Sequence, residues 1–195
     1  MKKIMIIFIL SIALICPAFS QSAGSDVHWS IFQLALLDEF ALPPMITDVY
    51  GLRINLVHGS VNNMSGLDIG LSQNVAGKMA GLQFGILFST ADYFMGLQLS
   101  TVNYAKNISQ FSFQSGILNM ASKNDGFQLG CVNISSDFSN AQVGVWNNAA
   151  NIGFMQLGLI NFSNKDLDGF QIGLLNFGPT WFFPIINWNP YKNNI

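Results

Sequence analysis

Between residues 51 and 176 the chain repeats one short pattern of apolar and polar residues nine times. In the copy GFQIGLLN, Phe170, Ile172 and Leu174 occupy one side of an extended chain, while Gln171 and Gly173 occupy the other. Alternation with a period of two, in segments rich in branched and aromatic residues, predicts β-strands. Short polar segments such as SSDFSN and SNKDLDG separate the copies and predict turns. No segment has a convincing helical period, so we expect an all-β protein.

The nine copies align into columns, and successive members of a column are 14 to 16 residues apart. One polar column is, in chain order, Arg53, Asp68, Gln83, Gln98, Gln114, Gln128, Gln142, Gln156 and Gln171. The position that ends each copy is occupied by His58, Gln73, Phe88, Asn103, Asn119, Asn133, Asn147, Asn161 and Asn176. Between these two columns most copies carry a glycine, which is unusual inside a strand and indicates a bend or the close approach of another group. Self-similarity at a fixed period predicts a repeat architecture.

Two architectures fit such a string of strands: a narrow β-solenoid of about nine coils, and an antiparallel β-meander or barrel. A column of Asn at the end of every copy favours the solenoid, because stacked amides at one corner can form a hydrogen-bonded ladder. The strands are also shorter than the 9 to 11 residues of an outer-membrane strand, and nine is an odd number. We therefore expect a solenoid, in which the Gln and Asn columns form the ladders.

The pattern leaves open which side of each strand faces inward. We expect the first apolar side to point inward, together with one apolar residue from most of the connecting segments: Met79, Phe94, Ile108, Phe138, Ile152 and Leu167. The other side carries Gln, Gly and an apolar stripe: Leu87, Val102, Leu118, Val132, Trp146, Ile160 and Leu175. An exposed stripe would mark a partner or membrane contact. The alternative, in which the stripe packs on the returning strand as core, is the one we expect.

The chain divides into four segments. Residues 1–20 combine Lys2 and Lys3 with an apolar run and the sequence Ala18-Phe19-Ser20, which is typical of a secretory signal peptide cut after Ser20. Residues 21–50 are apolar but off-period and predict an N-terminal cap on the repeat domain, residues 51–176. Residues 177–195 are rich in proline and aromatic residues and predict a C-terminal cap, because a solenoid must cover its open ends. The signal peptide predicts export to the cell surface, outer membrane or periplasm.

Charge and candidate chemistry narrow the function further. After the signal peptide six basic and ten acidic residues remain, a net charge of about −4, and no basic cluster indicates nucleic-acid binding. Cys131, the one cysteine beyond the signal peptide, fills a position held by Leu or Ile in other copies, so we expect a buried apolar residue. His28 and His58 have no nearby partners at metal-ligand spacing, and we expect neither a metal nor a cofactor.

Two acidic pairs are the candidates for catalysis. Asp38-Glu39 and Asp166/Asp168 could serve a glycosidase. Asp166 and Asp168 lie between two copies, however, where Asp is common because its side chain hydrogen-bonds turn backbone. The turn interpretation is the one we expect, so the sequence predicts no catalytic residue.

The repeat unit G-[LF]-Q-[ILF]-G-L-x-N, the opening GLRINLVHGSVNNMSGLDIGLSQN and the ending GPTWFFPIINW carry a resemblance. Over about residues 30–190 the chain resembles an uncharacterised family of bacterial surface-repeat proteins, known from spirochaetes and some gut bacteria. That resemblance implies export and surface exposure and supplies no catalytic residues.

Three functions remain as hypotheses. The first is a non-enzymatic exported surface or envelope repeat protein, structural or binding an envelope or host-surface partner, with membrane association left open. The second is an outer-membrane β-barrel or pore component. The third is a carbohydrate-active solenoid enzyme. We expect the first.

Overall fold

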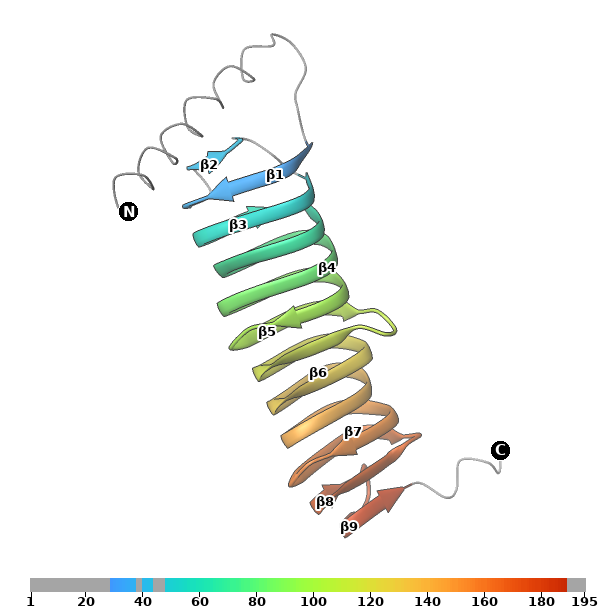
Figure 1. The fold of residues 1–195 in the computed structure, drawn as a ribbon. Coiled ribbons are helices and arrows are strands. Elements are labelled where there is room, and N and C mark those ends of the chain that lie inside the picture. The colour runs from blue at the N-terminus through green and yellow to red at the C-terminus, as the bar shows by residue number, and fades with distance from the viewer. Residues whose placement is uncertain (1–28, 38–39, 44–47, 189–195) are drawn as a thin grey trace.

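The computed structural model describes residues 29–37, 40–43 and 48–188, and in this part of the chain all regular structure is β. The strands are β1 (Trp29–Ala35), β2 (Ala41–Leu42), β3 (Asp48–Val61), β4 (Asn63–Leu99), β5 (Val102–Ile108), β6 (Phe113–Leu157), β7 (Ile160–Leu167), β8 (Phe170–Phe177) and β9 (Phe182–Trp188). Because β4 and β6 wind through several coils each, the chain forms one continuous helical stack of β-structure (Figure 1). This is the β-solenoid that the sequence predicted.

Neighbouring coils pair in parallel, with like residues on like. Leu52 pairs with Leu67 and Ile54 with Ile69, and the same register joins β4 to β6, β6 to β8 and β7 to β8. The two antiparallel pairings among the described strands lie at the ends of the stack, where β2 joins β1 and β9 joins β8. Parallel pairing of consecutive coils decides for the solenoid and against the antiparallel meander or barrel.

The ends of the stack differ from one another. β1 continues the parallel stack, with Gln33 paired to Arg53, and β2 follows as a short antiparallel strand. At the other end β9 turns back over β8, which places Asn187 beside Gln171. The signal peptide expected in residues 1–20 lies outside the described residues, as do parts of both predicted caps.

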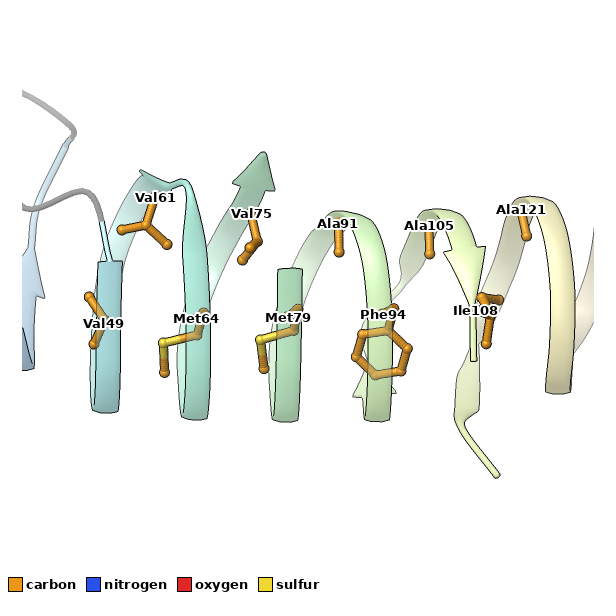
Figure 2. Close-up of a cluster of buried hydrophobic side chains, with 10 residues drawn as sticks. All are labelled: Val49, Val61, Met64, Val75, Met79, Ala91, Phe94, Ala105, Ile108 and Ala121. Atoms are coloured by element: carbon orange, nitrogen blue, oxygen red, sulfur yellow. The ribbon is translucent and has the colours of Figure 1, made fainter. Parts of the chain in front are cut away.

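Beside the connecting segments, two rows of side chains fill the interior of the coils (Figure 2). One row holds Val49, Met64, Met79, Phe94 and Ile108, and the opposite row holds Val61, Val75, Ala91, Ala105 and Ala121. Met64, Met79, Phe94 and Ile108 of the first row are larger than the Val and Ala residues of the other, so a large side chain and a small one together fill a narrow interior.

The inward residues predicted for the connecting segments are confirmed for Met79, Phe94, Ile108, Ile152 and Leu167. Phe138 is the exception. It is partly exposed, and its neighbour Ser139 is buried instead, where its hydroxyl accepts a hydrogen bond from Asn124 of the preceding coil.

Candidate functional site

The Gln column runs through the interior of the solenoid, and every Gln in it is fully buried. From Gln98 to Gln171, each Nε2 donates to the Oε1 of the Gln one coil earlier, at 2.6 to 3.0 Å. Asn187 of β9 donates to Gln171 Oε1 at 2.7 Å and extends the ladder by one step. Buried amides are costly unless they are hydrogen-bonded, and stacking satisfies them with their own copies.

The ladder ends at a buried ion pair near the N-terminal end. Gln83 donates to Asp68 Oδ2 at 3.2 Å, and Arg53 donates to both oxygens of the same carboxylate. Asn55 adds a bond to Asp68 Oδ1 at 2.8 Å. Both charged side chains are wholly buried, so the ionised pair depends on this set of donors.

The Asn column forms a second interior ladder, as the sequence predicted. From Asn103 to Asn161, each Nδ2 donates to the Oδ1 of the Asn one coil later, at 2.7 to 2.8 Å, and Asn176 is the last acceptor. The two ladders therefore run in opposite directions: the Gln amides donate toward the N-terminal end and the Asn amides toward the C-terminal end. Rows of aligned dipoles that point in opposite directions offset one another, which lowers the cost of holding both in an interior of low dielectric.

Two of the residues assigned to the end of a copy need a correction. The structure places Gly59 and Ser89, not His58 and Phe88, in register with Gln73 and Asn103. One extra residue precedes the corner in each of these coils, and in the first of them the shift is seen as a register irregularity between Asn55 and His58. His58 and Phe88 lie toward the outside instead.

The Asn ladder leaves no room for a Cβ at the glycine column. The second N–H of Asn119 donates to the Leu129 carbonyl at 2.8 Å, immediately before Gly130. A Cβ at Gly130 would lie 2.5 Å from Asn119 Nδ2 and 2.4 Å from the Gly116 carbonyl oxygen. Gly144, Gly158 and Gly173 are enclosed in the same way. Of the two reasons expected for a strand glycine, close approach is therefore the one that applies.

Because the amides face inward, the apolar side of the repeat faces outward, and our expectation that it forms the core is wrong. Strand alternation defines two sides, but it does not decide which is inside. Exposed members include Leu82, Ile86, Leu129 and Leu157. The uniform Gln column was the sequence signal that could have shown the amides to be inside. Different polar residues can occupy a solvent-exposed position, whereas a buried ladder requires side chains of the same length in successive coils.

We call this surface the outer apolar sheet. It consists of three parallel columns of nine residues each. The first is Leu52, Leu67, Leu82, Leu97, Phe113, Phe127, Ala141, Met155 and Phe170, of which Ala141 is buried. The second is Ile54, Ile69, Phe84, Leu99, Ser115, Leu129, Val143, Leu157 and Ile172. The third is Leu56, Leu71, Ile86, Thr101, Ile117, Cys131, Val145, Leu159 and Leu174.

Within the outer apolar sheet only Thr101 and Ser115 are polar. The third column is the most exposed, with Ile86 at 67% and Leu174 at 65% of full exposure. Cys131 belongs to this column and is an exposed free thiol, which corrects the buried position predicted for it. The sheet also holds a shallow groove of about 810 Å³ across the first five coils, where Thr101 and Ser115 replace larger side chains.

The apolar stripe expected to be core adjoins the third column and lies outside as well. Leu87, Trp146 and Leu175 are about two-fifths exposed, and the other members are partly exposed. Trp146 packs against Phe162 of the next coil, with ring centroids 5.2 Å apart. The stripe therefore widens the apolar surface beyond the outer apolar sheet.

The exposed and partly exposed charges of the described repeat coils lie in the connecting segments instead. They are Lys78, Asp92, Lys106, Lys123, Asp125, Asp137, Lys165 and Asp168. Lys123 Nζ lies 2.8 Å from Asp125 Oδ2, and the hydrogen bond to this carboxylate raises the pKa of Lys123. The solenoid is thus amphipathic across its section, with an apolar sheet on one side and charged connections on another.

Among the residues considered for catalysis or metal binding, the structure describes the side chains of His58 and Asp168. His58 lies 3.2 Å from Ser72 Oγ, and no group of three metal-binding side chains occurs in the described residues. Asp168 is exposed in a turn, where its backbone N–H donates to the Ile152 carbonyl at 2.9 Å. His28 and the pair Asp38-Glu39 lie outside the described residues, as does the side chain of Asp166.

The described part of the chain contains no helix long and apolar enough to cross a membrane. Comparison with protein-family models, with curated proteins and with solved structures finds no match to this chain. The fold itself is compatible with a structural repeat protein.

Proposed function

We propose that this chain is a non-enzymatic, exported repeat protein of the bacterial envelope, which acts by binding a partner through its outer apolar sheet. The outer apolar sheet is the observation that carries the proposal. Nine strands at about 4.8 Å spacing and five residues at about 3.3 Å each give it an area of roughly 700 Å². Exposed apolar patches larger than a few hundred Å² mark interaction sites in soluble proteins.

The interior supports a structural role. Ladder amides, apolar side chains and one ion pair fill it, and the glycines admit the close approach of the ladders. Such a stack holds the strands of the outer apolar sheet side by side, because most residues of each coil pair in parallel with like residues of the next. The export part of the proposal rests on the sequence of residues 1–20 and on the resemblance to bacterial surface-repeat proteins.

Two measurements on the full chain, expressed in a Gram-negative host, test the proposal. The mass of the exported chain should show cleavage after Ser20. N-ethylmaleimide should then label Cys131 slowly in intact envelopes, because a partner covers the outer apolar sheet. The matched control carries Cys131→Ser with Ser136→Cys, which moves the thiol to an exposed connecting segment of the same coil.

The control thiol should react rapidly in the same envelopes. A Cys131 that reacts as fast as the control thiol would show an uncovered sheet and contradict the binding role. An uncut chain retained in the cytoplasm would contradict export.

A further inference from the structure

We infer that the partner on the outer apolar sheet is a second copy of this chain, packed sheet to sheet around a two-fold axis. The inference rests on the proposed function, since it names the occupant of the same surface. It commits to a symmetric dimer in which each copy buries the three outer columns of the other.

The area of the sheet fits such a dimer. At roughly 700 Å² per copy, two sheets would bury roughly 1,400 Å² in total, within the 1,200–2,000 Å² of a stable protein–protein interface. A patch of half this area would bury less than that range requires. This one reaches the required size without any contribution from the ends of the solenoid.

The chemistry of the sheet also fits a copy of itself. It carries no charge, and its backbone groups are used in the ladders between parallel coils, so the contact of two such faces would bury few polar groups. Sheets that pack face to face lie about 10 Å apart and form a shared apolar core. Homodimer interfaces are more apolar than other protein contacts.

A lipid surface fits less well. Proteins that lie on anionic membranes use basic residues beside the apolar face. In the described repeat coils the charges lie in the connecting segments, where Lys78, Lys106, Lys123 and Lys165 are balanced by acidic residues such as Asp92 and Asp125. The exposed or partly exposed charged residues nearest in sequence to its first column are acidic, since Asp125 and Asp168 lie two residues before Phe127 and Phe170.

The position of Ser115 allows a geometric test. It is the fifth of nine residues in the middle column, and therefore lies at the centre of the outer apolar sheet. If the two sheets overlap fully, the two-fold axis passes beside Ser115, and its copies face each other across the interface. Ile117 lies two residues away in the same coil and is 59% exposed in the single chain.

The experiment measures the mass of the exported, purified chain by sedimentation in buffer without detergent. Wild type should sediment at twice the mass of one chain. Ile117→Lys should raise the dissociation constant of the dimer at least 100-fold, because removing a charge from water without a partner is strongly unfavourable. The control, Tyr93→Lys, changes an exposed aromatic residue in a connecting segment and should leave the dimer intact.

A cross-link tests the same arrangement independently. In a Cys131→Ser background, Ser115→Cys should be joined to its copy by a bis-maleimide of about 10 Å reach, the spacing between packed sheets. Ser136→Cys should not be joined.

The possible outcomes separate the two proposals. A monomer whose Cys131 is nevertheless protected in envelopes would overturn the dimer and leave the proposed function standing. Binding of wild type, but not of Ile117→Lys, to phosphatidylglycerol vesicles without dimerisation would identify a membrane as the occupant and overturn the dimer. A dimer weakened by Tyr93→Lys rather than by Ile117→Lys would place the interface elsewhere and overturn it too.

Discussion

Replacing Asn147 by Asp tests the interior ladder with almost no change in shape. Asn147 is fully buried, and its Nδ2 donates to Asn161 Oδ1 at 2.8 Å and to the Leu157 carbonyl at 3.0 Å. Its Oδ1 accepts from Asn133 at 2.8 Å, a bond that a carboxylate keeps. The substitution therefore exchanges one group, the donor NH₂, for an acceptor oxygen that faces two other acceptors.

The expected loss follows from these contacts. Each buried acceptor left without a donor costs about 1–3 kcal/mol, so two of them cost about 2–6 kcal/mol at pH 7. The desolvation of the carboxylate adds to this cost. A loss of this size is a large share of the ~5–15 kcal/mol that stabilises a typical domain.

The loss should depend on pH in a defined direction. Burial and the two facing acceptors disfavour the ionised form of the introduced carboxyl group, so its folded-state pKa should lie above its unfolded value of about 3.9. The folded state then binds more protons than the unfolded state between these two pKa values. The penalty is therefore largest at neutral pH and shrinks as the pH falls through the folded pKa, where the carboxyl can again donate one bond.

Urea unfolding followed by far-UV circular dichroism, at neutral pH and at a pH near the unfolded pKa, measures both effects. The matched control is Asn148→Asp in the same coil, because Asn148 lies toward the outside and its Oδ1 accepts from Asn164 at 3.0 Å, as a carboxylate would. The control should change the free energy of unfolding by less than about 0.5 kcal/mol. Equal stability of the two variants at neutral pH would refute the buried ladder.

Three further predictions concern the ion pair, the glycine column and the repeat. Arg53→Gln should lower the free energy of unfolding by about 3–5 kcal/mol, because Asp68 is left as a buried charge without its ion-pair partner. The double variant Arg53→Gln with Asp68→Gln should recover most of this loss, because it continues the Gln ladder. A double variant no more stable in urea than the single one would contradict this. Gly130→Ala should lower the free energy of unfolding by about 1–3 kcal/mol or more, because the new Cβ meets a backbone carbonyl, whereas Gly178→Ala, with no atom nearer than 3.2 Å, should be close to neutral. Deletion of residues 128–141 removes one coil, and Gln142 then takes the place of Gln128 next to Gln114 in the ladder. The protein should still fold, since each coil contacts only its neighbours. Loss of the β-type circular dichroism spectrum would show that the coils are not equivalent.

The period and the stacking direction could be predicted from the sequence because like residues recur at a nearly constant spacing. Alternation identified the strands, and the Asn column indicated that coils stack like on like. The interior and exterior could not be assigned by hydrophobicity, because the usual rule places apolar residues inside. Here the amides can be buried because neighbouring coils provide their hydrogen-bond partners. These partners come together only when the coils stack, so the hydrophobicity of a single copy does not reveal them.

Local irregularities were the other source of error. At His58 and Phe88 one extra residue before the corner moves the inward position to Gly59 and Ser89, and no local feature of the sequence marks the insertion. Phe138 was predicted to point inward because it is apolar, yet Ser139 is the residue that hydrogen-bonds inside the stack. Cys131 was placed in the core by analogy with Leu and Ile, which are themselves outside.

Hydrogen exchange of side-chain amides tests most directly the central claim that the amides are inside and the apolar sheet is outside. In D₂O, the ¹⁵N-labelled side-chain NH₂ signals of Gln128, Gln142, Asn133 and Asn147 should persist for hours, because these groups are fully buried and hydrogen-bonded. The signal of Asn62, which is exposed, should disappear at once. Loss of the ladder signals as rapidly as that of Asn62 would place the amides in solvent and contradict the account.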